Sequence, residues 1–185
     1  MEKYKIAVII GSLRKGSFNR KIANALIKLA PETLSFNILN IGKLPLYNED
    51  MESNEPQEWL TFREELQAHD GVLFFTPEYN RSVPAALKNA LDVGSRPYGG
   101  SSWDKKPAGI VSVSPGAFGA FGANHHLRQS LVFLNMPAMA QPEAYIAGAS
   151  KLFDEEGTLT DERTKNTIKK FAVAYAEWVK SCVVK

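Results

Sequence analysis

Short apolar runs that alternate with stretches of helical periodicity constrain the fold of this chain more than any other feature. Three nearly continuous apolar runs have the length of a strand and the character of strands buried on both faces: Ile6–Ile10, Gly71–Thr76 and Ala108–Ser114. Weaker strand patterns occupy Leu34–Ile41 and part of Pro137–Ile146. The sequence therefore predicts five strands, most of them buried within a sheet.

Each predicted strand is followed by residues whose apolar positions recur at helical spacing. These stretches, with their capping and stop signals, predict helices at 17–30, 56–69, 82–93, 127–134 and 160–183. Strands that alternate with helices pair in parallel, with helices on both faces of the sheet. At 185 residues, we expect one α/β domain over residues 1–185, a flavodoxin-like three-layer sandwich with the strand order 2-1-3-4-5.

The overall charge and the cysteine count exclude several classes of partner and site. With 22 basic and 20 acidic residues the formal net charge is +2, which is too small for a nucleic-acid binding surface. Cys182 is the only cysteine, so the chain forms neither an internal disulfide nor a multi-thiolate metal site.

The first apolar run is too short for a signal peptide, and no apolar stretch is long enough to span a bilayer. We expect a cytoplasmic protein with neither a nucleic-acid nor a membrane partner.

The histidines do not predict a metal site. His125 and His126 are adjacent on a predicted helix and therefore point to different faces, and His69 lies at a helix end. The acidic residues between Glu49 and Glu55 are expected to form a solvated loop rather than a cation site. We therefore expect no metal.

The predicted strand order brings three loops to one edge of the sheet. Because the chain winds in opposite directions from the first and third strands, the loops at their carboxyl ends diverge and leave a crevice where ligands bind. Segments 11–19 and 77–82 become neighbours there, and the loop at 114–122 forms the far rim. These loops hold the candidate functional residues.

The first of these loops has the composition of an anion site. It carries Ser12, Arg14, Ser17 and Asn19 at the start of a helix, where backbone N–H groups and the dipole favour a phosphate. The dipole contributes about 0.3–1 kcal/mol, and each charge-assisted hydrogen bond contributes about 1.5–3 kcal/mol. The side chains therefore decide the affinity. Because the glycine spacing of dinucleotide and triphosphate loops is missing, a monophosphate fits best. The alternative is that Ser17 is only a helix cap and Arg14 a solvated charge.

The second loop, Pro77 to Ser82, places an aromatic and several polar side chains beside the crevice. Its backbone N–H groups can bind the acceptor atoms of a flat heteroaromatic ring while the crevice wall covers one ring face. The alternative is that Asn80 only shapes a turn and that Tyr79 is anchored in the core with its hydroxyl in solvent.

These two loops together resemble the NADPH-dependent FMN reductase family, flavodoxin-like flavoproteins that include quinone, chromate and azo reductases. The resemblance covers nearly the whole chain. It rests on Gly11-Ser12-x-Arg14-x-x-Ser17-x-Asn19 and on Pro77-Glu78-Tyr79-Asn80 followed by Ser82, Pro84, Leu87, Lys88 and Asn89. Both motifs stand in order after the expected strands.

The resemblance implies an FMN site and assigns its parts. The residues implied around the FMN phosphate and ribityl end are Ser12, Arg14, Ser17, Phe18 and Asn19. Those implied along the isoalloxazine are Pro77, Glu78, Tyr79 and Asn80, and those at its pyrimidine edge are Ser114, Pro115 and Gly116. No side chain is implied as a catalytic residue, because the flavin carries the chemistry. The family habit implies a homodimer or homotetramer.

The implied activity is that of an FMN-dependent NAD(P)H oxidoreductase. Two electrons pass from NADPH or NADH through FMN to a small acceptor: a quinone, a flavin, an azo compound or chromate. The alternative is a non-enzymatic electron carrier of flavodoxin type; such carriers are strongly acidic, whereas this chain is near neutral. Arg81 and His125 stand where one branch of the family often has Tyr, and Gly122 where it often has Arg. These departures bear on the preferred acceptor and on tetramer contacts.

Overall fold

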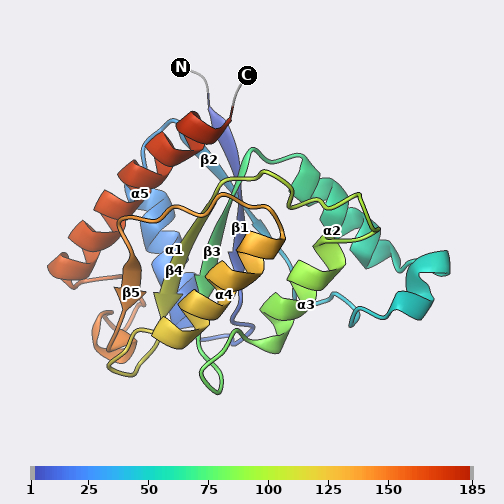
Figure 1. Cartoon of the computed structure of the whole chain (residues 1–185). Helices are drawn as coiled ribbons and strands as arrows, with labels where there is room; N and C mark the ends of the chain where they lie inside the picture. The colour runs from blue at the N-terminus through green and yellow to red at the C-terminus, as the bar shows by residue number, and fades with distance from the viewer. Residues whose placement is uncertain (1–2, 184–185) are drawn as a thin grey trace.

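A five-stranded parallel sheet in the order β2-β1-β3-β4-β5 forms the centre of the computed structural model, which describes residues 3–183 (Figure 1). The strands are β1 (Tyr4–Ile10), β2 (Leu34–Leu39), β3 (Gly71–Thr76), β4 (Ala108–Val113) and β5 (Ala144–Ile146). All four strand pairs are parallel. Every residue of β3 and β4 is buried, which explains their continuous apolar sequences. The predicted strand order is confirmed.

Helices cover both faces of the sheet. On one face lie α1 (Phe18–Leu29) and α5 (Glu162–Cys182), and Ile22 and Phe171 join them in one core. On the other lie α2 (Gln57–Gln67), α3 (Ala85–Gly94) and α4 (Phe121–Phe133) (Figure 1). The core between these helices and the sheet contains Trp59 and Trp103. None of the helices within residues 3–183 combines the length and the apolar character needed to cross a membrane.

Two helices start at different places from those predicted. α3 begins at Ala85 instead of residue 82, because Ser82 pairs with Tyr79 in a turn and Pro84 occupies the N-cap position. α4 begins at Phe121 instead of residue 127, since Ala120, with a φ of 60°, turns the chain directly into the helix. The fifth strand is only three residues long. The two helix starts were thus set by the local turn chemistry before α3 and by the left-handed backbone of Ala120 before α4.

The segment between β2 and α2 leaves the sheet and returns to it. It contains a short 3-10 helix, η1 (Glu49–Asn54). Asn89 on α3 holds this segment: its Oδ1 accepts from the backbone N–H of Tyr47 at 2.8 Å, and its Nδ2 donates to the carbonyl of Pro45 at 3.0 Å. The indole N–H of Trp59 donates to the same carbonyl at 2.9 Å. The excursion is thereby fixed beside α3.

Candidate functional site: three loops at the carboxyl edge of the sheet

The loop after β1 buries most of its polar side chains. Ser12, Ser17 and Asn19 are 6%, 2% and 3% exposed, whereas Arg14 is exposed. The Oγ of Ser17 accepts from the backbone N–H of Arg20 at 3.2 Å, so Ser17 is the predicted helix cap. Buried hydroxyls and an exposed guanidinium at one helix N-terminus form a cradle of the kind that binds a phosphate.

Asn19 carries a polar atom whose hydrogen-bonding capacity is unused. Its Nδ2 donates to the carbonyl of Val113 at 3.4 Å, which ties the start of α1 to the end of β4. Its Oδ1 is buried and has no hydrogen-bond partner within the described residues. A buried acceptor without a donor costs about 1–3 kcal/mol. A ligand that carries hydroxyl groups, as the ribityl chain of FMN does, would relieve this cost.

Phe18 contributes to this loop through its backbone. Its ring stacks on Phe153 with the centroids 6.1 Å apart and an interplanar angle of 13°. The ring is therefore engaged in packing between α1 and the segment before α5. Because Phe18 is the first residue of α1, its N–H has no acceptor within the helix. That N–H, rather than the ring, is the group suited to a phosphate.

The start of the first loop lies against the end of β3 and the start of α3, the elements that flank the second loop. The backbone N–H of Gly11 donates to the carbonyl of Phe75 at 2.8 Å. A Cβ at Gly11 would lie 3.1 Å from Cγ of Pro84 and 3.3 Å from Leu87. The glycine thus permits a close approach between the loop after β1 and the start of α3.

The second loop is a tight hairpin. Tyr79 and Ser82 exchange backbone hydrogen bonds of 3.1 and 3.0 Å, and Asn80 and Arg81 between them have φ angles of 50° and 63°. Two successive residues with positive φ are the mark of a type I′ turn, which favours Asn-Gly. Asn80 therefore does shape a turn. Tyr79 is 53% exposed and is not anchored in the core. Arg81 occupies the position preferred by glycine at a cost of about 1–2 kcal/mol.

Glu78 fastens this hairpin to the first turn of α4. Its Oε2 accepts from the backbone N–H of Ala123 at 3.1 Å, and its Oε1 lies 3.3 Å from Nη1 of Arg81. The N-cap residue of α4, Ala120, provides no side-chain cap. The carboxylate of Glu78 therefore satisfies an N–H group at the helix N-terminus, where negative charge is favoured. Sequence reasoning did not predict this contact between residues far apart in the chain.

Gly122 allows the hairpin to rest on α4. A Cβ there would lie 2.8 Å from the carbonyl oxygen of Arg81 and 2.9 Å from Oε2 of Glu78, closer than real Cβ contacts. The two departures from the family pattern at positions 81 and 122 are thus linked, because the backbone carbonyl of Arg81 occupies the space that a side chain at position 122 would need.

The third loop, 114–116, is held from the side of β5. The backbone N–H of Ser114 donates to the carbonyl of Ile146 at 3.0 Å, and Ala149 donates back to Ser114 at 3.1 Å. The backbone N–H of Gly148 donates to Gly116 at 3.1 Å. Ser114 is half-buried, whereas Pro115 and Gly116 are exposed. The loop is anchored at both ends and open at its tip.

A polar network joins the end of β4 to the residues before α4 and to α4 itself. Ser112 donates to the carbonyl of Gly119 at 2.7 Å, Asn124 donates to Ser112 at 3.3 Å, and Nε of Arg128 donates to Oδ1 of Asn124 at 3.0 Å. Sequence reasoning missed this network. The one available signal was Asn124 itself, a polar residue on the helix face that also carries the buried Leu127 and Leu131.

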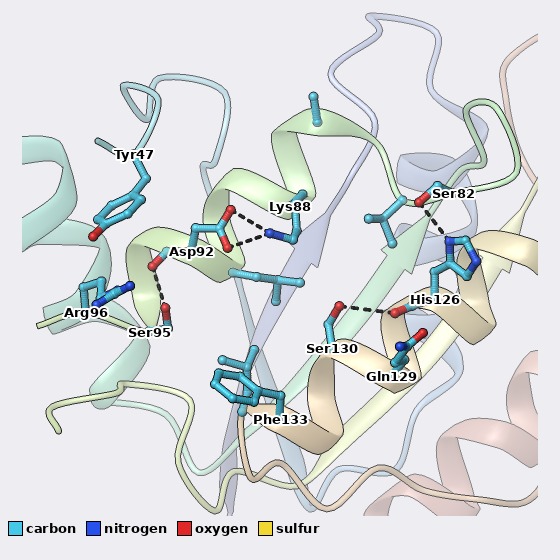
Figure 2. Close-up of a pocket in the computed structure, with 14 residues that line it drawn as sticks. Tyr47, Ser82, Lys88, Asp92, Ser95, Arg96, His126, Gln129, Ser130 and Phe133 are labelled. Carbon is cyan, nitrogen blue, oxygen red and sulfur yellow. Dashed lines mark hydrogen bonds and ion pairs between the residues drawn. The ribbon is translucent and has the colours of Figure 1, made fainter. Parts of the chain in front are cut away.

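A groove of about 860 Å³ lies between α3 and α4, next to the hairpin (Figure 2). At one end Nδ1 of His126 lies 3.0 Å from the hydroxyl of Ser82, and along the wall Lys88 pairs with Asp92 at 2.8 Å. The predicted cofactor residues are not among those that line it. They lie instead on the three loops at the carboxyl ends of β1, β3 and β4.

The two adjacent histidines contact different elements, as predicted. His126 faces the hairpin, whereas Nε2 of His125 lies 3.0 Å from the hydroxyl of Tyr145 on β5. That hydroxyl donates to Glu143 at 2.6 Å. Burial and this hydrogen bond raise the pKa of Tyr145 to about 12. Among residues 3–183, no three His, Cys, Asp or Glu side chains gather in a way that could hold a metal ion.

Known proteins resemble this chain over most of its length. Residues 4–151 match the family described as NADPH-dependent FMN reductase. A quinone reductase of Pseudomonas putida is 60% identical over 178 residues, covering 96% of this chain and 95% of that protein. A 2-hydroxy-1,4-benzoquinone reductase of a Burkholderia species is 45% identical, covering 95% of this chain and 96% of that protein. The solved flavoenzyme NAD(P)H:(acceptor) oxidoreductase of Paracoccus denitrificans aligns with a TM-score of 0.90 at 40% identity, covering 96% of this chain and 98% of that chain. This chain, with the fold and both motifs described above, belongs to the NADPH-dependent FMN reductase family.

Proposed function

We propose that the three loops at the carboxyl edge of the sheet bind FMN and that the protein reduces a small acceptor, a quinone in the first instance, with electrons from NAD(P)H. When bound, FMN accepts a hydride from NAD(P)H and passes two electrons to the acceptor. The observation that carries the proposal is the cradle of buried Ser12, Ser17 and Asn19 at the N-terminus of α1, which follows the strand paired with β3.

Different residues of the three loops bind different parts of this cofactor. Ser12, Ser17 and Arg14 bind the phosphate together with the first backbone N–H groups of α1. Asn19 accepts from the ribityl chain, and the hairpin 77–80 supports the ring. The third loop, 114–116, approaches its pyrimidine edge. We assign no catalytic side chain, because binding and orientation are what these residues supply.

The nature of the relatives favours an enzyme over an electron carrier. Proteins of 60% and 45% identity are named for the reduction of a quinone and of 2-hydroxy-1,4-benzoquinone. Electron carriers of flavodoxin type are strongly acidic, which helps them dock onto protein partners, whereas the formal net charge of this chain is +2.

We further propose that residues 1–185 act as one domain in the cytoplasm, on small-molecule substrates rather than on nucleic acid or a membrane.

The purified protein is expected to be yellow, with about one FMN per chain, and to bleach when NADPH or NADH is added without oxygen. The colour should return when a quinone such as 1,4-naphthoquinone is added. The measurement is the flavin absorbance band. A colourless protein that takes up no added FMN would contradict the proposal, and a bound flavin that neither nucleotide reduces would favour the carrier.

We also propose that the protein assembles as a homodimer or homotetramer through α4. Val132 and Phe133 at the end of this helix are 80% and 87% exposed, and large apolar side chains in water at such levels mark contact surfaces. Replacing Phe133 by Asp is expected to reduce the mass measured by light scattering to that of the 20.5 kDa chain. The matched control is Val173→Asp on α5, which is 48% exposed on the opposite face of the sheet. Equal masses for wild type and Phe133→Asp would contradict this interface.

A further inference from the structure

Arg81 extends from the hairpin into solvent at the rim of the proposed flavin site. Its side chain is 74% exposed. The carbon of its guanidinium lies 5.5 Å from the ring centroid of Phe118, on the loop that follows β4. Phe118 is itself 67% exposed. The arginine therefore reaches from the second loop to the segment between the third loop and α4, and it is exposed to solvent next to residues proposed to hold the flavin.

The backbone beneath this guanidinium is fixed and strained. Arg81 has a φ of 63° at the second central position of the tight turn, where glycine is favoured. Its carbonyl oxygen is packed against Gly122 at the start of α4. The turn therefore fixes the backbone from which this side chain extends. An arginine at this position costs folding stability relative to glycine. Such local strain is common at positions that serve binding or catalysis.

The charge of Arg81 is only partly balanced. Its ion-pair partner among the described residues is Glu78, at 3.3 Å, and the other oxygen of that carboxylate is already engaged by the N–H of Ala123. A guanidinium has five N–H donors in a planar fork suited to phosphate, sulfonate or carboxylate. Because the side chain is largely exposed and pairs with Glu78 through Nη1, donors of this fork are accessible to a ligand.

We propose that Arg81 binds an anionic group of the substrate that reacts with the flavin, and so favours anionic substrates over neutral ones. The inference rests on the proposed function and adds the class of substrate. The anion comes from the nucleotide, as a phosphate, or from the acceptor, as an acidic group on the quinone; both present oxygen anions to the same fork.

The test compares matched substrates in each half-reaction, with the FMN-loaded protein and its Arg81→Ala variant. Stopped-flow absorbance measures flavin reduction by NADH and NADPH, and reoxidation by 1,4-naphthoquinone and by 1,4-naphthoquinone-2-sulfonate. The ratio of wild-type to variant rate constants is taken for each substrate, so that differences in intrinsic reactivity cancel. Calorimetry measures binding of the sulfonate to the oxidised FMN-loaded protein, which is a readout independent of turnover.

Controls separate loss of charge from loss of structure. Lys169→Ala removes one positive charge from the exposed face of α5, on the opposite side of the sheet, and should change no ratio. Arg81→Gly suits the turn better and should melt no lower than wild type, yet lose the same discrimination as Arg81→Ala. Arg81→Lys keeps the charge without the planar fork and should retain part of the discrimination between anionic and neutral substrates.

We expect the second-order rate constant for at least one anionic substrate to fall about tenfold in Arg81→Ala, while the neutral quinone changes less than twofold. A loss confined to NADPH identifies its additional phosphate, and a loss for both nucleotides identifies the pyrophosphate. A loss confined to the sulfonated quinone, with weaker binding by calorimetry, identifies the acceptor. Equal losses for neutral and sulfonated quinone, or no change above twofold for any substrate, would overturn the inference. Failure of the wild-type protein to bind or reduce FMN would instead overturn the proposed function.

Discussion

The double variant Arg14→Ala/Ser17→Ala is expected to bind FMN at least a hundredfold more weakly than wild type. Each charge-assisted hydrogen bond to a phosphate is worth about 1.5–3 kcal/mol, and every 1.4 kcal/mol is tenfold in a dissociation constant. Titration of the apoprotein, followed by quenching of flavin fluorescence, measures the effect. Riboflavin, which lacks the phosphate, should bind both proteins about equally.

Two further variants show whether the phosphate is the cause. Ser17→Asp keeps a good N-cap for α1 but places a negative charge where the phosphate would lie. This variant should fold normally, and its affinity for FMN should fall more than its affinity for riboflavin. Lys28→Ala removes an exposed charge from the last turn of the same helix and should leave FMN binding unchanged. If Lys28→Ala weakens FMN as much as the double variant does, the phosphate is not bound at the N-terminus of α1.

Gly122→Ala is expected to lower FMN affinity at least tenfold and to destabilise the fold by about 1–3 kcal/mol. The added Cβ would meet the carbonyl of Arg81 at 2.8 Å and Oε2 of Glu78 at 2.9 Å. The carbonyl belongs to a tight turn with two residues at positive φ, so the hairpin must move as a unit, away from α4. Glu78 would then lose its contact with Ala123, and the support for the flavin ring would shift.

The sign of the change in unfolding free energy shows whether the Cβ at position 122 clashes with the hairpin. In an unhindered helix, replacing Gly by Ala stabilises by about 0.5–1 kcal/mol, so a net loss in thermal or urea unfolding requires the clash. Gly100→Ala is the matched control, because its Cβ would meet nothing closer than 3.4 Å. A Gly122→Ala protein with wild-type melting and FMN affinity would show that the hairpin is not held by α4.

Local patterns in the sequence were sufficient for the elements that depend on local physics. The apolar runs of β1, β3 and β4 were recognised because both faces of a parallel sheet are buried. Ser17 was recognised as a cap because its side chain satisfies an N–H three residues away. The start of α4 was misplaced by six residues, since glycines at 116, 119 and 122 indicate a loop, and only the packing against the hairpin shows that Gly122 belongs to the helix.

The sequence by itself determined the class of fold, the strand order and the two loops proposed to hold FMN, because hydrophobic periodicity and chain connectivity carry that information. The tertiary structure decided how those loops are fixed. The contact of Glu78 with Ala123 joins residues 45 positions apart, and that of Asn19 with Val113 joins residues 94 positions apart. No local pattern records such contacts, since they exist only once the parallel sheet has brought the carboxyl ends of β1, β3 and β4 to one edge. The exposed guanidinium of Arg81 became a candidate for recognising a substrate only in that setting.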